Sequence, residues 1–91
     1  MTDEQIRRED CRCDVLNALY ARRAGAHEAT TIRTVFLRNR DYTLGEIENA
    51  LSDLERFHQV ERAFASKHSA VEVWQITGDG LVEVERRQRR G

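Results

Sequence analysis

The clearest pattern of hydrophobic and polar positions lies in mid-chain, in residues 42–57 (YTLGEIENALSDLERF). Its apolar side chains recur at the helical period of 3.6 and form one face: Leu44, Ile47, Ala50, Leu51, Leu54 and Phe57. Thr43 as N-cap places Glu46 at the third helical position, which completes a capping box, and Tyr42 can pack on Ile47 as a hydrophobic staple. The pattern predicts a helix over residues 43–57.

Two further helical patterns precede it. Residues 3–24 carry apolar side chains at helical spacing, with Thr2 and Gln5 in the form of a capping box and Gly25 as a stop signal. The first turns have little apolar surface, so we expect them to fray. Residues 29–39 predict a second helix, whose inner stripe we assign to Ile32, Val35 and Phe36.

After residue 58 the period changes from 3.6 to 2. Residues 60–66 (VERAFAS) and 71–77 (VEVWQIT) are short and rich in β-branched and aromatic side chains, which predicts an antiparallel hairpin over residues 60–77. Trp74 and Ile76 share a face and should point to the core. Thr77 can cap a final short helix, and we expect the basic end, residues 86–91, to be frayed.

Length and charge limit the class of protein. The chain has 91 residues, so we expect a single domain over residues 1–91. Its formal net charge of -1 gives no general attraction to phosphate or to anionic lipid, so any basic surface must be local. No apolar run is long enough to cross a bilayer and the first ten residues are highly charged, so we expect a cytoplasmic protein with no membrane partner.

The sequence offers little catalytic or metal-binding chemistry. Cys11 and Cys13 lie two residues apart in a helical pattern, so their side chains diverge and are expected to be reduced, partly buried thiols. The histidines are scattered without ligand spacing, and the chain has no Gly-rich phosphate loop or nucleophile elbow. We therefore expect no metal, no cofactor and no enzymatic activity.

The order of these elements resembles a known family. The segments YTLGEIENALSDLERFHQV and VWQITGDG are similar to the third helix and the wing of the winged helix-turn-helix domain, which is common in small bacterial and phage regulators. The resemblance implies an α+β, mainly α fold with three helices, a two-stranded hairpin wing and a short C-terminal helix. His58 replaces the family's usual glycine after the third helix, and histidine can enter the left-handed region at modest cost.

The resemblance also implies a function. In family members that bind DNA, the third helix (residues 43–57 here) enters the major groove and the wing (residues 60–77) lies along the backbone or minor groove. On a helical wheel the positions opposite the apolar face are Gly45, Asn49, Ser52 and Arg56. Asparagine can read adenine, arginine can read guanine, and serine is versatile, so Asn49, Ser52 and Arg56 are the candidate base readers, while Gly45 permits close approach.

The charge of the third helix opposes that function. Residues 43–58 contain four acids and one arginine, a local sum of -3, and backbone phosphates normally require several basic side chains. We expect compensation from cations elsewhere, on the second helix, on the wing and in the tail: Arg33, Arg38, Arg40, Arg62, Lys67, His68, Arg86, Arg87, Arg89 and Arg90.

Two alternatives concern partners. An acidic third helix would also suit an adaptor that binds a basic protein through charge complementarity. A homodimer is compatible with either function, since two copies could exchange apolar faces through Tyr20, Leu81 and Val84. Double-stranded DNA is the partner that the sequence favours.

Overall fold

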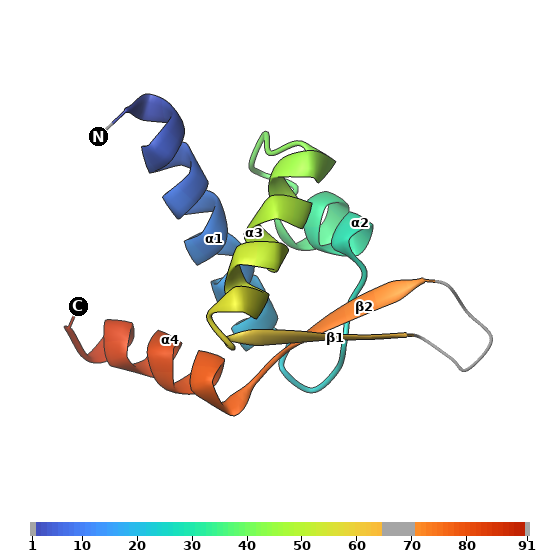
Figure 1. The fold of residues 1–91 in the computed structure, drawn as a ribbon, viewed down its shortest axis with the longest axis vertical. Coiled ribbons are helices and arrows are strands. Elements are labelled where there is room, and N and C mark those ends of the chain that lie inside the picture. The colour runs from blue at the N-terminus through green and yellow to red at the C-terminus, as the bar shows by residue number, and fades with distance from the viewer. Residues whose placement is uncertain (1, 65–70, 91) are drawn as a thin grey trace.

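The computed structural model describes residues 2–64 and 71–90, and Figure 1 shows how they are arranged. In chain order the elements are α1 (Asp3–Ala21), α2 (Ala29–Thr31), the π-helical turn η1 (Ile32–Phe36), α3 (Leu44–Arg56), β1 (Val60–Phe64), β2 (Glu72–Ile76) and α4 (Gly78–Arg90). The helices α1, α2 and α3 are grouped together, the hairpin lies beside them, and α4 leads away from its base (Figure 1). This order confirms the expected α+β, mainly α architecture with a hairpin and a C-terminal helix.

Both predicted capping boxes are present. At the start of α3, Thr43 Oγ1 accepts from the backbone N–H of Glu46 at 3.2 Å, and Glu46 Oε1 accepts from the N–H of Thr43 at 3.0 Å. Thr2 and Gln5 make the same reciprocal pair before α1. These bonds satisfy backbone donors that have no intrahelical partner, so each helix begins where its local sequence directs.

The core forms where α1 and α3 pack together and the hairpin covers one end. Its largest fully buried side chains come from helices at both ends of the chain, from η1 and α3, and from the hairpin: Val15, Leu16 and Leu19 of α1, Ile32 of η1, Ile47 and Leu51 of α3, Val60 of β1 and Val84 of α4. Each side chain of this size contributes about 1.5–3 kcal/mol when it leaves water. Trp74 is 5% exposed and Ile76 packs against the same cluster, as the alternation along β2 predicts.

The hairpin is antiparallel, and its register pairs Val60 with Ile76 and Arg62 with Trp74. A third segment extends the sheet, because His27 and Trp74 exchange two backbone hydrogen bonds of 2.8 and 2.7 Å. These bonds satisfy the otherwise unpaired edge of β2 at Trp74 and fasten the loop before α2 to the wing.

The second helix is shorter than predicted. Instead of a continuous α-helix over residues 29–39, the chain makes one α-helical turn and then a π-helical turn, in which the Leu37 N–H donates to Ile32 O at 2.9 Å. Thr34 Oγ1 donates to Thr30 O at 2.8 Å, and such side-chain bonds compete with the regular ladder. Val35 is consequently 55% exposed, so its assignment to the inner stripe was wrong.

The first and last helices have other bounds than the sequence indicates, and the fraying of their ends stays a prediction. Helix α1 is regular from Asp3, although it stops at Ala21 rather than residue 24, and α4 continues to Arg90 through the segment expected to be frayed. Within α4, Glu83 accepts hydrogen bonds from Arg86 and Arg87 one turn later, which supports the basic end. Val84, proposed as a dimer contact, is 2% exposed and belongs to the core instead.

Two smaller expectations are confirmed. His58 has a φ of 61°, in the left-handed region where glycine is usual after a helix. Cys11 and Cys13 are free thiols, the first buried and the second partly buried. Burial raises the pKa of the Cys11 thiol to about 11, so it remains protonated at neutral pH.

The helices can also be compared with the thickness of a bilayer. None of those in the described residues is long and apolar enough to span a membrane.

Candidate functional site

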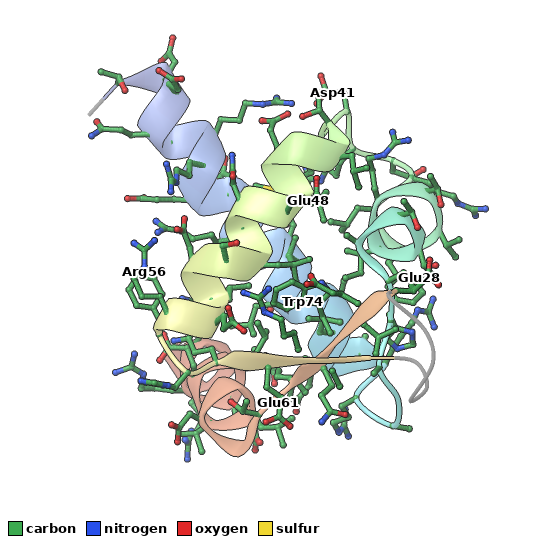
Figure 2. The ribbon with its side chains drawn as sticks, turned by 45° about the vertical axis from the view of Figure 1, so that its right-hand side comes forward. Glu28, Asp41, Glu48, Arg56, Glu61 and Trp74 are labelled. Atoms are coloured by element: carbon green, nitrogen blue, oxygen red, sulfur yellow. The ribbon has the colours of Figure 1, made fainter. Side chains whose placement is uncertain are left out.

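The outward surface of α3 carries the three candidate base readers and Gly45. Gly45, Asn49, Ser52 and Arg56 are all exposed, because the apolar face of the helix is turned into the core. Figure 2 shows Arg56 at the C-terminal end of α3, with Glu48 nearer the N-terminal end of the same helix. The geometric part of the prediction, a polar ridge on the solvent side of α3, therefore agrees with the structure.

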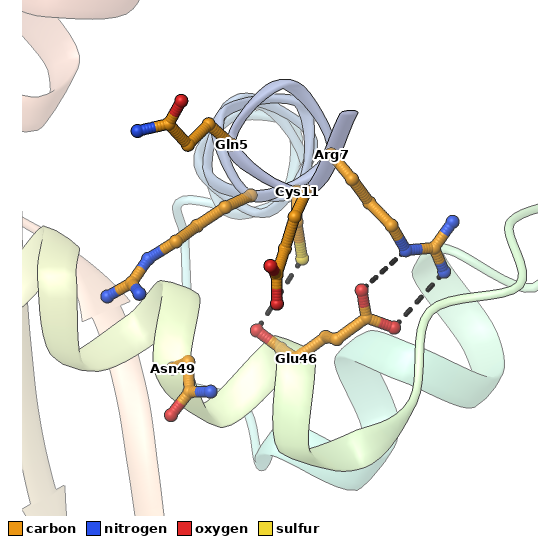
Figure 3. A pocket seen from close by; sticks show the side chains of 7 residues that line it. Gln5, Arg7, Cys11, Glu46 and Asn49 are labelled. Atoms are coloured by element: carbon orange, nitrogen blue, oxygen red, sulfur yellow. Dashed lines mark hydrogen bonds and ion pairs between the residues drawn. The ribbon is translucent and has the colours of Figure 1, made fainter. Parts of the chain in front are cut away.

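Two hollows flank this ridge and divide its residues. One, of about 410 Å³, lies between α1 and α3 and is lined by Asn49 together with Arg7, Arg8 and Glu46 (Figure 3). The other, of about 380 Å³, lies between α2, α3 and the wing and is lined by Ser52 with Glu48, Thr30 and Arg62. The ridge is thus bordered by α1 on one side and by the wing on the other.

Glu46 is held by α1. Arg7 donates from Nε to Glu46 Oε2 at 2.6 Å and from Nη2 to Oε1 at 3.1 Å, as Figure 3 shows. These bonds, helped by the capping bond from the Thr43 N–H, lower the pKa of Glu46 to about 2. The carboxylate completes its capping box and binds a neighbouring helix at the same time.

Asp53 is the buried charge of the site, with 3% of its surface exposed. Arg8 donates to both of its oxygens at 3.0 Å, and Arg12 and Arg56 approach to 3.7 and 4.0 Å. The bonds from Arg8 are the main reason that the pKa of Asp53 lies below its ordinary value. A buried carboxylate needs such partners, and here three arginines surround it.

Glu55 is held from the wing. Arg62 on β1 donates to its two oxygens at 2.8 and 2.6 Å and to Glu72 of β2 at 3.2 Å. The Arg62 guanidinium also lies 5.2 Å from the centre of the Trp74 ring. Arg62 was expected to be a free cation on the wing, but the structure places it between two carboxylates and an aromatic ring.

The other predicted cations differ in whether they form ion pairs. Arg40 lies 3.4 Å from Asp14, and Arg86 and Arg87 pair with Glu83. Arg33, Arg38 and Arg89 are exposed and have no ion pair within residues 2–64 and 71–90. Lys67 and His68 lie outside the described residues.

The arginines that neutralise most of the acids of α3 were not predicted from the sequence. The predicted compensating cations lie on the second helix, the wing and the tail, whereas Arg7, Arg8 and Arg12 of α1 provide most of the compensation. One signal was available: Arg8 and Arg12 are one turn apart on α1, and Glu46 and Asp53 are two turns apart on one side of α3. The two spacings differ, so they indicate charged sides on both helices without showing which arginine meets which acid.

Comparison with known proteins identifies the fold. No protein-family model matches the chain, and a search of curated proteins finds no significant match. Among solved structures it is similar to a mutant of MepR from a multidrug-resistant S. aureus clinical isolate, with a TM-score of 0.70 and 21% sequence identity. The similarity covers 85% of this chain and 53% of the MepR chain, so the protein spans about half of that structure. The likeness confirms a winged helix-turn-helix fold.

Proposed function

Starting from the winged helix-turn-helix fold, we propose that the protein binds double-stranded DNA in a sequence-specific manner and acts as a small transcription regulator. Helix α3 would lie in the major groove, and the hairpin would contact the adjacent backbone. The observation that carries the proposal is the exposed polar ridge of α3, where three of the four neighbouring acids are bound to arginines of the same chain.

Those internal ion pairs answer the main objection to the proposal. The formal charge of -3 on residues 43–58 would repel phosphates, but Glu46, Asp53 and Glu55 each hold an arginine from another element. The field of an ion pair falls off faster with distance than that of a single charge, so the surface is closer to neutral than the sequence suggests. Exposed Arg33 and Arg38 are then the candidates for phosphate contacts, together with Arg40, Lys67 and the arginines of α4.

Base recognition would come from the ridge itself. Asn49 can bond adenine at N6 and N7, Ser52 can bond several bases, and Gly45 lets the helix backbone approach. Arg56, whose side chain is 73% exposed, is only 4.0 Å from Asp53 and can turn outward to bond guanine at O6 and N7.

An electrophoretic titration against a randomised duplex library, at two salt concentrations, tests the proposal. We expect a shift that weakens with salt, and a selected site that Arg56→Ala binds about 1–3 kcal/mol more weakly. Arg23→Ala is the matched control, because it also removes one positive charge. Arg23 follows α1 and donates a hydrogen bond to the Tyr20 carbonyl. Equal affinity of Arg56→Ala and wild type for that site would remove Arg56 from base reading.

A second candidate is an adaptor that binds a basic protein. The observation in its favour is the hollow between α3 and the wing, where Glu28, Glu48 and Glu72 accompany a single arginine that is already paired. An adaptor of this kind should shift no duplex even near 50 mM salt, where phosphate attraction is strong. A salt-sensitive shift would count against it.

Two copies would read two half-sites, and we propose a homodimer for that reason. Tyr20 and Leu81 are partly buried and keep some surface for such a contact, whereas Val84 does not. Sedimentation equilibrium with and without a selected duplex tests this point, and a single chain per duplex at saturation would contradict it.

A further inference from the structure

The four acids of α3 are not equivalent. Glu46, Asp53 and Glu55 are bound by Arg7, Arg8 and Arg62 respectively. For Glu48, by contrast, no hydrogen bond or ion pair is found within the part of the chain that the structure describes, and its side chain is exposed. A structural role explains the first three acids, and it does not explain Glu48.

Glu48 also occupies a particular place. It lines the hollow between α2, α3 and the wing, on the same side of α3 as Ser52, and Thr30 at the start of α2 lies across from it. Figure 2 shows it midway along α3, on the outer side of the helix and apart from Arg56. If α3 enters a major groove, this position faces the groove between the two elements that approach the backbone.

The chemistry of a carboxylate selects one base at such a position. An ionised glutamate can only accept hydrogen bonds. In the major groove cytosine presents the N4 amino donor, guanine presents two acceptors, and thymine presents an acceptor and a methyl group. Adenine has a donor at N6, but its N7 acceptor lies beside it and repels a carboxylate.

We propose that Glu48 is a specificity-determining residue that accepts a hydrogen bond from cytosine N4 and disfavours the other three bases. This inference rests on the proposed binding of DNA by α3. In this role the unpaired acid contributes specificity, although its charge repels phosphate. An interface gains specificity by penalising wrong partners as well as by favouring the right one.

The test compares the sites selected from a randomised duplex library by the wild type, Glu48→Gln and Glu48→Ala. The wild type should require cytosine at one position. Glu48→Gln should prefer adenine there, because the amide can both donate to N7 and accept from N6, with a change in the cytosine-to-adenine ratio of roughly tenfold or more. Glu48→Ala should lose the preference at that position and bind unselected duplex more tightly, because a negative charge is gone.

Glu55→Gln is the matched control. It also removes one carboxylate from α3, but its partner is Arg62, so the selected bases should stay those of the wild type. Both Glu48 variants should unfold at the wild-type temperature, since the side chain is exposed.

Failure of the role of Glu48 and failure of DNA binding give different results. An unchanged base preference in Glu48→Gln, with wild-type protein that selects a site, would overturn the role of Glu48 and leave DNA binding intact. If the wild type shifts no duplex at 50 mM salt, both proposals fall. A basic peptide that binds the wild type and loses affinity for Glu48→Gln would then assign the residue to the adaptor interface.

Discussion

At the scale of single residues, Asp53 links α3 to α1 through an ion pair. It is 3% exposed and takes two 3.0 Å bonds from Arg8. Asp53→Asn keeps the size of the side chain and removes its charge, so we expect the free energy of unfolding to fall by about 1–2 kcal/mol. This value lies between those typical of an exposed ion pair and of a buried hydrogen bond to a charged group. Urea denaturation measures it.

Glu48→Gln supplies the comparison, because it makes the same chemical change on the same helix at an exposed position with no partner in the described chain. It should alter the free energy of unfolding by less than about 0.5 kcal/mol. Equal losses in the two variants would show that the bonds to Asp53 contribute nothing to stability.

His58 is a second residue whose effect is local. With φ at 61° its backbone is strained, because a residue with a Cβ enters the left-handed region at a cost that glycine does not have. His58→Gly should raise the free energy of unfolding by about 0.5–1 kcal/mol, because the relief of backbone strain outweighs the greater freedom of glycine in the unfolded chain. His58→Val should lower it by about 1 kcal/mol or more. Thermal unfolding of both variants checks the sign, and a stabilising valine would contradict it.

At the scale of elements, Gly80 lets α4 approach the start of the wing. A Cβ at this position would stand 2.2 Å from Gln59 O and 2.6 Å from Ile76 Cγ1, and the backbone oxygen cannot move aside. We expect Gly80→Ala to lower the free energy of unfolding by about 1–3 kcal/mol, as for overpacked cores. Gly78→Ala, where a Cβ meets nothing within 4 Å, should be neutral or stabilise by up to about 1 kcal/mol.

The contact between α1 and α3 should depend on pH through Glu46. Its pKa is lowered from 4.5 to about 2 in the folded protein, so its ion pair with Arg7 stabilises the fold above about pH 4.5, and this contribution is lost as the pH falls toward 2. Glu46→Gln lacks that contribution at every pH and retains the capping box. The difference in unfolding free energy between the two proteins should therefore shrink from pH 7 to pH 2.5, and a constant difference would contradict the assignment.

At the scale of the whole molecule, ion pairs between elements make stability sensitive to salt. The formal net charge is -1, so there is little overall repulsion for salt to screen, whereas the pairs of Arg7 and Arg8 with α3 are partly exposed. We expect the unfolding temperature to fall between 50 and 500 mM sodium chloride. The fall should be smaller in the double variant Arg7→Gln, Arg8→Gln, and an equal or larger fall would contradict this explanation.

The features of this molecule that depend on residues close together in the sequence could be predicted, and those that depend on distant residues could not. Helix α3 was predicted nearly to its ends, because the Thr43 cap and the apolar period act within a few residues of each other. The second helix was not, because the bond from Thr34 to Thr30 and the π-helical turn depend on side-chain positions that a periodicity does not describe. The exposure of the candidate site followed from the same helical period. The arginines that pair with the acids around it did not.

By itself, then, the sequence determined where α3 and the hairpin begin, which side of each is apolar, and that Asn49, Ser52 and Arg56 face solvent. Tertiary structure alone decided which acids of α3 are neutralised. Arg8 and Asp53 are 45 residues apart, and they meet only because α1 crosses α3 at the angle set by the packing of Leu16, Ile47 and their neighbours. Caps and periods are short-range properties, but the pairing of charges depends on how whole elements are packed.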